Sequence, residues 1–187
     1  MLRIATAVAA CCFALPLIAQ SIDYGRSRIT IVSKQMKVPV EAEFRKFTAS
    51  IEFDPARPEA GKAQIEIDLA SFDIGDAETN NDVRGRNWFD TRAFPTAKFV
   101  SSSIRALGAG RYEVRGPLTI KGRTHEVTAP ISVKSDGAAR LYEGGFVLRR
   151  LQYNIGEGVW RDTDTVADEV EIRFRIVQAA GKPPASK

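Results

Sequence analysis

Residues 47–69 read FTASIEFDPARPEAGKAQIEIDL, and this stretch decides the fold class. Apolar residues occupy every second position of 47–53 and again of 63–69, with polar residues between them. A period of two gives an extended strand one apolar and one polar face. The intervening 54–62 contains two prolines and a glycine, which is typical of a turn. The stretch therefore predicts a hairpin of two half-buried strands.

The same alternation extends over most of the chain on both sides of this hairpin. It recurs, in places less regularly, in 29–32, 38–44, 99–107, 112–120, 127–133, 141–149 and 170–176. Turns are expected at 108–110 and 121–123. Only 76–87 lacks alternation, and Asp76 stands there in the N-cap position, which predicts a short helix or an ordered loop. About eight strands at this spacing predict an all-β protein, either a sandwich or a barrel.

The first twenty-one residues differ from the rest of the chain. Arg3, the apolar stretch 4–19 and the small residues of Ala19-Gln20-Ser21 are typical of a secretory signal cleaved after Ser21. Two alternatives stay open: Val8-Ala9-Ala10-Cys11 resembles a lipobox that would make Cys11 or Cys12 a lipid-carrying terminus, or the segment is an uncleaved anchor. We expect export to the periplasm, one domain over 22–178, and a disordered tail over 179–187.

Composition excludes several classes of function. The 187 residues are 44% apolar and 27% charged, with a formal net charge of +4, which is too mild for nucleic-acid binding. No apolar run after residue 21 reaches the roughly 18 residues of a membrane helix. Both cysteines precede residue 21 and His125 is the single histidine, so we expect no disulfide, metal or cofactor. Asp162, Asp164, Asp168 and Glu169 lack the calcium-loop pattern and are interpreted as surface charge.

The alternation leaves open whether the interior is filled. A barrel of about eight strands is either plugged by side chains or wide enough for one small ligand. The early and central strands carry large side chains (Phe44, Phe47, Phe53, Phe72, Phe89, Phe94, Phe99), and other positions carry the smaller Ala49, Ala63, Val127 and Ala129. Large and small side chains on opposite walls can leave a slot, and the alternative is a core in which they interdigitate.

Three longer stretches carry a resemblance to a known family. They are SFDIGDAETNNDVRGRNWFDTRAFPTAKFVS (71–101), GPLTIKGRTHEVTAPISV (116–133), and LQYNIGEGVW (151–160) followed by VADEVEIRF (166–174). Together they resemble the YceI-like, polyisoprenoid-binding family of secreted bacterial lipocalin-like barrels. The resemblance spans 24–177. It implies an antiparallel lipocalin-like β-barrel with a short helical crossover and a central tunnel for the prenyl tail of a quinone-like or isoprenoid lipid.

The resemblance and the alternation together give a list of candidate site residues. Apolar ligand contacts are expected from Phe44, Phe47, Ile51, Phe53, Ile65, Ile67, Leu69, Phe72, Phe89, Phe99, Leu118, Ile120, Tyr153 and Trp160. Asp82, Arg84 and Arg86 are candidates for holding a headgroup, because guanidinium groups suit phosphate acceptors. The alternative for Asp82 and Arg86 is an ion pair one turn apart on an exposed helix. Trp160 either closes over the mouth or packs against its rim.

Three functions follow from these observations. The first is a periplasmic carrier or store of an isoprenoid lipid or similar amphiphile, without catalysis, that contacts membranes transiently and could form a homodimer. The second is an accessory module with a filled barrel that docks on a membrane redox or stress-response complex. The third is an enzyme on an apolar substrate that uses Asp82, His125 or Arg86; for His125 we prefer a hydrogen-bonded structural role.

Overall fold

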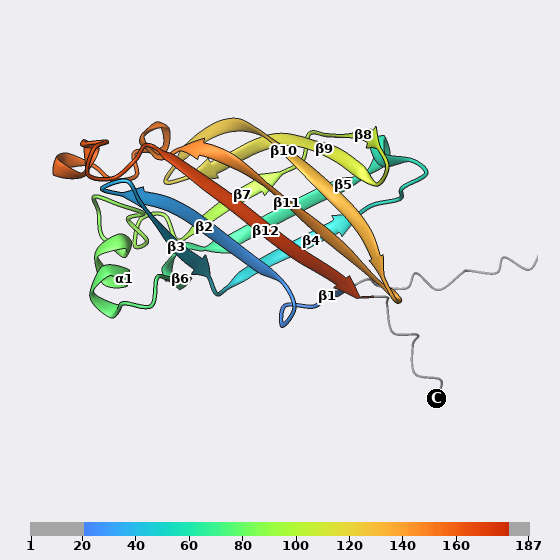
Figure 1. The fold of residues 1–187 in the computed structure, drawn as a ribbon, viewed down its shortest axis with the longest axis horizontal. Helices are drawn as coiled ribbons and strands as arrows, with labels where there is room; N and C mark the ends of the chain where they lie inside the picture. Colours follow the sequence, from blue (N-terminus) through green and yellow to red (C-terminus); the bar gives the residue numbers. More distant parts are fainter. Residues whose placement is uncertain (1–20, 180–187) are drawn as a thin grey trace, which may run out of the picture.

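Nearly all of the regular structure belongs to one antiparallel sheet that curls on itself (Figure 1). The computed structural model describes residues 21–179. The strands are β1 Ser21–Ile22, β2 Arg28–Gln35, β3 Val38–Phe44, β4 Phe47–Glu52, β5 Lys62–Asp68, β6 Phe72–Asp73, β7 Thr96–Val100, β8 Ser103–Gly108, β9 Arg111–Ile120, β10 Arg123–Asp136, β11 Ala139–Arg149 and β12 Glu169–Ala179. The helix α1 spans Ala77–Arg84, and short 3-10 turns are η1 Pro58–Ala60, η2 Leu69–Ser71, η3 Arg150–Tyr153 and η4 Gly158–Arg161.

The strand order is β4-β5-β7-β9-β10-β11-β12-β2-β3-β6, with β1 beside β12 and β8 beside β9. This confirms the expected antiparallel fold with one helical crossover. The number of strand segments is twelve, not about eight, because long strands are bent or broken. The chain of β3 and β4 is one example: it pairs with β2 up to residue 43 and, after a bend at 45–46, pairs with β5 from Phe47.

Several elements predicted from local sequence signals are present in the structure. Phe47 pairs with Ile67 and Ile51 with Ala63, so the quoted stretch is the expected hairpin of β4 and β5. Asp76 caps α1, because its carboxylate accepts the Thr79 amide at 2.8 Å. The helix ends at Arg84 with Gly85 as its cap, so Arg86 lies outside it. The expected Asp82–Arg86 ion pair is therefore wrong, and none within 4.0 Å is present in 21–179.

The predicted strand 99–107 is broken into β7 and β8, and Gly116 leaves room for the chain at the break. Both segments pair with β9, and the break at 101–102 lies opposite Gly116. A side chain on Gly116 would collide with the Val100 carbonyl oxygen and with the backbone of residues 101 and 102. The Ser102 amide instead donates to the Arg115 carbonyl at 2.8 Å, which carries the chain from one segment to the next.

The sheet does not close by a continuous ladder of backbone hydrogen bonds. The free edge of β4 is contacted by three side chains from other parts of the chain. Gln178 Nε2 donates to the Ile51 carbonyl at 2.7 Å, Arg140 Nη1 donates to the Phe53 carbonyl at 2.6 Å, and the Ala49 amide donates to the Tyr24 hydroxyl at 3.4 Å. We call this junction the seam. It satisfies edge groups that would otherwise invite another strand.

The central contact of the seam is buried and extends into β11. Gln178 is 3% exposed, and its Oε1 accepts the Tyr142 hydroxyl at 2.8 Å. The Tyr142 ring also meets the edge of Phe53, whose own ring meets Tyr112 with centroids 4.9 Å apart. Burial raises the pKa of Tyr142, so this hydroxyl stays protonated and donates. One polar chain, Tyr142 to Gln178 to the carbonyl of Ile51, therefore joins three strands.

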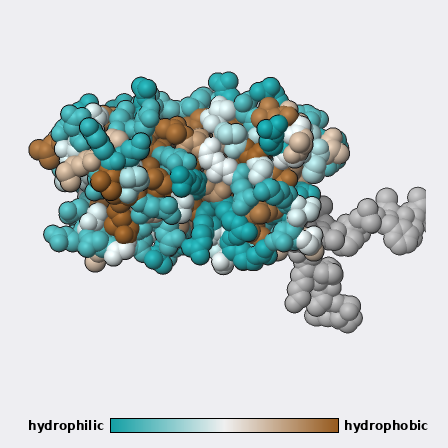
Figure 2. All heavy atoms as spheres, in the orientation of Figure 1, coloured by the Kyte–Doolittle hydropathy of each residue, from teal (hydrophilic) through white to brown (hydrophobic). Residues whose placement is uncertain are grey.

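The two ends of the described chain meet beside the seam. Ser21 pairs with Ala179, and Ile22 with Gln178. Ala179 is thus the last residue of β12 and not the first residue of a tail, because the strand ladder includes it. Of the predicted signal, Ser21 alone is described, as the first residue of β1; residues 1–20, both cysteines and the remainder of the predicted tail lie outside residues 21–179. Within that range no helix has the length and apolar character needed to cross a bilayer. The face of the molecule in Figure 2 is mostly hydrophilic, with scattered hydrophobic patches.

We predict that Gln178→Leu lowers the free energy of unfolding by about 1–3 kcal/mol, because the Tyr142 hydroxyl and the Ile51 carbonyl each lose a buried partner. Urea unfolding monitored by circular dichroism measures this. Gln152→Leu changes an exposed side chain and is the control, for which we expect less than about 0.5 kcal/mol. Adding Tyr142→Phe to Gln178→Leu should cost less than Tyr142→Phe costs in the wild type. Equal effects of the two glutamine variants contradict a seam held by Gln178.

Candidate functional site

The curled sheet encloses a cavity of about 450 Å³ that opens at one end. This volume lies within the range of ligand-binding pockets, about 300–1,000 Å³. The cavity lining includes residues of α1 and of the 150–167 segment, which lie at the left-hand end of Figure 1, and we call this end the mouth. Twelve of the fourteen predicted apolar contacts line the cavity: Phe44, Ile51, Phe53, Ile65, Ile67, Leu69, Phe72, Phe89, Phe99, Leu118, Ile120 and Trp160.

Small side chains on the inner faces of three strands explain why the interior is not filled. Ala63 of β5, Ala97 of β7 and Ala129 of β10 line the cavity, as does Val127. Aromatic rings from the β3, β6 and α1 region pack on one another, with Phe44 and Phe72 centroids 5.9 Å apart. The rings therefore cluster instead of reaching the alanine-lined strands. The slot interpretation, and not the filled core, describes this interior, although Ala49 does not line it.

Phe47 and Tyr153 do not line the cavity. Phe47 follows the bend at 45–46 and meets the edge of Tyr24, with ring centroids 5.5 Å apart. Tyr153 is 1% exposed and packs edge-on against His125, with centroids 4.9 Å apart. Its hydroxyl has no hydrogen-bond partner among the described residues, and burial raises its pKa to about 12. Tyr153 is therefore a core residue next to the site and not a wall of it.

Of the three headgroup candidates, Asp82 alone lines the cavity. The Nε of Arg84 donates to the Ala70 carbonyl at 2.9 Å, which directs this side chain along the outside of the wall. Arg86 follows the helix and is exposed, with its side chain outside the cavity lining. The prediction of an arginine pair around a phosphate group is not supported by this placement.

Alternation also marks lining residues that the sequence analysis did not select. The inner faces of β2, β11 and β12 supply Ile29, Ile31, Phe146, Leu148, Ile172, Phe174 and Ile176. All seven lie at alternate positions of predicted strands, so the alternation could have identified them as inward-facing. The selection passed over this half of the barrel.

Arg150 binds the loop that borders the mouth, and the sequence analysis did not select this residue. The side chain is 2% exposed and lines the cavity. All of its bonds go to backbone carbonyls of the next loop: Ala167 at 3.0 Å, Ile155 at 2.8 Å, Gly156 at 3.3 Å, Trp160 at 2.6 Å and Val166 at 2.7 Å. Burial lowers the pKa of this guanidinium, and the Asp168 carboxylate opposes that shift. Its parity with Phe146 and Leu148 was the signal that could have marked it as inward-facing.

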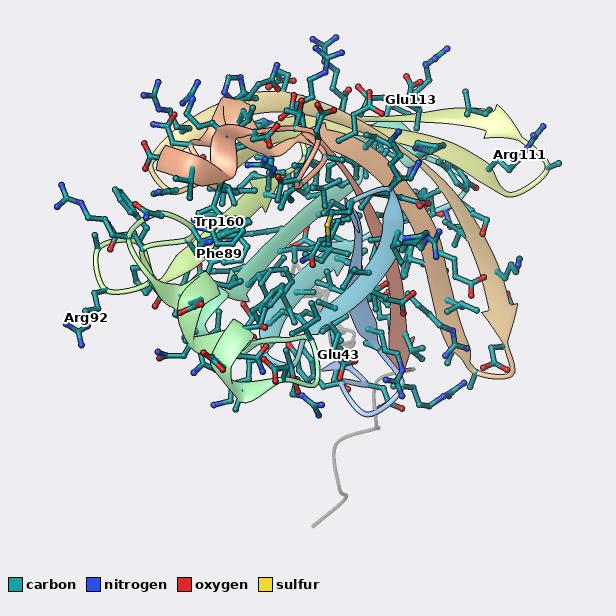
Figure 3. The ribbon with its side chains drawn as sticks, turned by 60° about the vertical axis from the view of Figure 1, so that its left-hand side comes forward. Glu43, Phe89, Arg92, Arg111, Glu113 and Trp160 are labelled. Atoms are coloured by element: carbon teal, nitrogen blue, oxygen red, sulfur yellow. The ribbon has the colours of Figure 1, made fainter. Side chains whose placement is uncertain are left out.

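Two tryptophans lie close to the Arg150 side chain. Trp88 and Trp160 have ring centroids 5.5 Å apart, and the Arg150 guanidinium lies 5.8 Å from the Trp88 ring. Figure 3 shows Trp160 and Phe89 at this end of the barrel, while Arg92 extends away from it. Because Trp160 both lines the cavity and packs on Trp88, it forms part of the rim.

Lys121 ties the β9–β10 turn to the same rim. Its Nζ donates to the Arg86 carbonyl at 2.8 Å, to the Asn154 carbonyl at 2.8 Å and to Glu157 Oε2 at 2.9 Å. This ammonium lowers the pKa of Glu157. The amides of residues 156 and 157 also donate to the Asn87 carbonyl. We call the joined segments 86–89 and 150–167 the collar; its bonds hold the mouth in one arrangement.

The remaining polar candidates take part in local hydrogen bonds. His125 Nε2 lies 3.1 Å from the Gln152 carbonyl oxygen, as expected for a structural histidine, and His125 does not line the cavity. Asp162 accepts from the Asp164 amide and from the Thr165 hydroxyl, while Asp168 accepts from the Leu151 amide. No group of three or more His, Cys, Asp or Glu within 21–179 could hold a metal ion. The site is thus an apolar chamber with a polar mouth.

Comparison with known proteins agrees with this architecture. The YceI-like domain model matches residues 21–178. The chain is 46% identical to Burkholderia cenocepacia BcnA, whose crystal structure covers 84% of this chain and 99% of that one with a TM-score of 0.82. A polyisoprenoid binding domain from Saccharophagus degradans, implicated in plant cell wall breakdown, shares the fold at 19% identity, with a TM-score of 0.69 over 87% of this chain and 99% of that one.

Curated relatives are named UPF0312 proteins. One from Azotobacter vinelandii is 27% identical over 139 residues, which cover 71% of this chain and 70% of the relative. Another from Pseudomonas syringae pv. syringae is 32% identical over 109 residues, which cover 57% of this chain and 55% of the relative. The match to this Pseudomonas relative therefore spans about half of its length.

We predict that Arg150→Lys lowers the free energy of unfolding by about 2–4 kcal/mol, because three ammonium donors cannot satisfy five carbonyl contacts. The emission of Trp88 and Trp160 should shift to longer wavelength as the collar loosens. Arg149→Lys alters the exposed neighbour, and we expect it to change stability by less than about 0.5 kcal/mol. Urea unfolding and fluorescence spectra measure both. Indistinguishable behaviour of the two variants argues against Arg150 as the collar's hub.

We predict that Tyr153→Phe raises the free energy of unfolding by about 1 kcal/mol, because it removes a buried hydroxyl that has no partner. Thermal unfolding measures the change. Tyr142→Phe is the matched comparison, since that hydroxyl has a partner and its loss should destabilise. A lower melting temperature for Tyr153→Phe would mean that the hydroxyl is hydrogen-bonded in solution.

Proposed function

The chain belongs to the YceI-like domain family, and from this premise we propose that it binds an isoprenoid lipid, or a similar amphiphile such as a prenylated quinone, in its cavity. The observation that carries the proposal is a cavity of about 450 Å³ with a mostly apolar lining and a few polar residues at the mouth. Strand β12, with eleven residues, is on the order of 36 Å long, which suits an extended hydrocarbon tail. The polyisoprenoid-binding name of the Saccharophagus relative supports the same class of ligand.

The proposed role is that of a carrier or store. Burying one methylene from water gains about 0.8 kcal/mol, and a tail of several isoprene units would nominally exceed the strongest known affinities. The donor of such a tail is a bilayer, however, which is itself apolar. Moving the tail between membrane and protein changes its hydration little. Net affinity then depends on tail fit and headgroup, so exchange with membranes is feasible.

The proposed location is the periplasm, reached through the signal of residues 1–21 and followed by transient contact with a membrane. This rests on the residue pattern of that segment. Dimerisation stays a prediction that sedimentation of the purified protein can test.

Ligand binding without catalysis fits the placement of the polar side chains better than an enzymatic role does. An enzyme needs its acid, base or electrophile at the substrate. Asp82 lines the cavity, but His125 and Arg86 do not. The accessory-module alternative assumed a filled barrel, and the cavity of about 450 Å³ removes that assumption.

We predict that Ala63→Phe abolishes lipid binding while the fold is kept, because the ring projects into the cavity from β5. Gln64→Phe places the same ring on the outer face of the adjacent position and is the matched control. Protein purified without detergent is extracted with organic solvent, and the extract is analysed by mass spectrometry. Uptake of tritiated geranylgeraniol, a C20 prenyl alcohol, is measured in parallel.

The wild type and Gln64→Phe should yield a prenylated molecule and bind the probe, and Ala63→Phe should do neither. Ile67→Asp, which buries an unpaired carboxylate in the same wall, should also lower recovery. Circular dichroism verifies that each variant is folded. A wild-type protein that is repeatedly empty and never takes up prenyl probes would refute the proposal.

A further inference from the structure

The charges at the cavity mouth are unusual for a site that binds a phosphorylated lipid. Two charged residues, Asp82 and Arg150, line the cavity within residues 21–179. A phosphate or diphosphate site normally offers free guanidinium, ammonium or amide donors. The headgroup that the mouth accepts depends on whether Asp82 and Arg150 offer such donors.

Arg150 has no donor left for a ligand. Its five N–H groups meet five carbonyl oxygens of the collar, as described above, and the planar guanidinium carries no further donor. The carbonyl dipoles point their negative ends at the guanidinium, and the Asp168 carboxylate adds a favourable charge interaction. The cation is thus compensated within the protein, so it neither bonds an anionic headgroup nor presents a free charge to one.

Asp82 is in the opposite situation. It is exposed at the end of α1, lines the cavity, and forms no ion pair or side-chain hydrogen bond with the rest of residues 21–179. Of the cations on the neighbouring segments, Arg84 contacts the Ala70 carbonyl and Lys121 is paired with Glu157, while Arg86 and Arg161 lie outside the cavity lining. Within the lining, the charge without a partner is therefore negative.

The other polar side chains in the lining are neutral. Ser33 and Gln35 come from β2, Thr79 from the same face of α1 as Asp82, and Thr165 from the collar. Hydroxyl and amide groups of this kind suit an uncharged headgroup, and the Asp82 carboxylate is an acceptor for a hydroxyl proton.

We propose that Asp82 is a specificity-determining residue that makes the mouth select amphiphiles with an uncharged, hydroxyl-bearing headgroup and reject phosphate and diphosphate headgroups on the same tail. This inference rests on the proposed function, because it presumes that a prenyl tail enters the cavity. It concerns the headgroup alone. Like charges repel across the few ångströms of a partly desolvated mouth, which is enough to change affinity by about tenfold.

The test compares tritiated geranylgeraniol with tritiated geranylgeranyl diphosphate, which share the C20 tail. Dissociation constants are measured by equilibrium binding, below micelle-forming concentrations, for the wild type, Asp82→Asn and Glu78→Gln. Glu78→Gln removes the same charge from an exposed position of α1 outside the cavity lining. The quantity compared between variants is the ratio of the two dissociation constants, so the different water solubilities of the probes cancel.

We expect the wild type to bind the alcohol more tightly than the diphosphate. Asp82→Asn should narrow the ratio by about tenfold, mainly by strengthening diphosphate binding, while Glu78→Gln leaves the ratio within about twofold of the wild type. Raising the salt concentration to about 1 M, where the Debye length is about 3 Å, should narrow the wild-type ratio and have little effect on Asp82→Asn.

The outcomes separate the two proposals. If neither probe binds the wild type, tail binding itself fails and this inference fails with it. If the wild type binds the diphosphate as tightly as the alcohol, or if Asp82→Asn and Glu78→Gln shift the ratio equally, headgroup selection by Asp82 is refuted while tail binding stands.

Discussion

The seam is the constraint on which the cavity depends. Strands joined by a backbone ladder lie about 4.8 Å apart. Here β4 is joined to the far side of the sheet through the side chains of Gln178, Arg140 and Tyr24. Side chains span a wider gap than a ladder does, so the sheet curls without drawing its walls together. Three backbone groups along this edge nevertheless have partners, which lessens the exposed-edge hazard of an open sheet.

The collar at the opposite end makes the chamber a preformed site. Arg150 and Lys121 bind backbone carbonyls from segments on both sides of the mouth. Ordering of loops on ligand binding costs affinity, and a mouth that is already bonded avoids most of that cost. A rigid mouth also gives Asp82 a fixed position relative to the headgroup, which selection by charge requires.

The sequence predicted the strands and most of the cavity wall because both follow from a period of two. Phe53 and Ile67 are examples: burial of one strand face fixes the direction of their side chains. Phe47 has the same parity but lies after the bend at 45–46, and the bend depends on which strand the chain pairs with next. The placement of Arg84 and Arg86 outside the cavity lining could not be predicted, because the helix end, and therefore the direction of each side chain, depends on tertiary contacts such as that with Ala70. Arg150 could be predicted to point inward, but its five partners come from a loop without periodicity.

The cavity and a bilayer both place the tail of an amphiphile and its headgroup in different environments. The tail meets an apolar environment in both places, so it contributes little to the preference for one over the other. The headgroup meets water and lipid phosphates at the membrane surface, whereas here it meets neutral side chains and the Asp82 carboxylate. A charged headgroup is well solvated at the membrane surface and gains nothing at this mouth, since the donors of Arg150 are already used. An uncharged headgroup loses little on transfer. In the proposed exchange, the equilibrium between membrane and protein is therefore decided at the mouth, by a small number of polar side chains, although nearly all of the buried contact area lies along the tail.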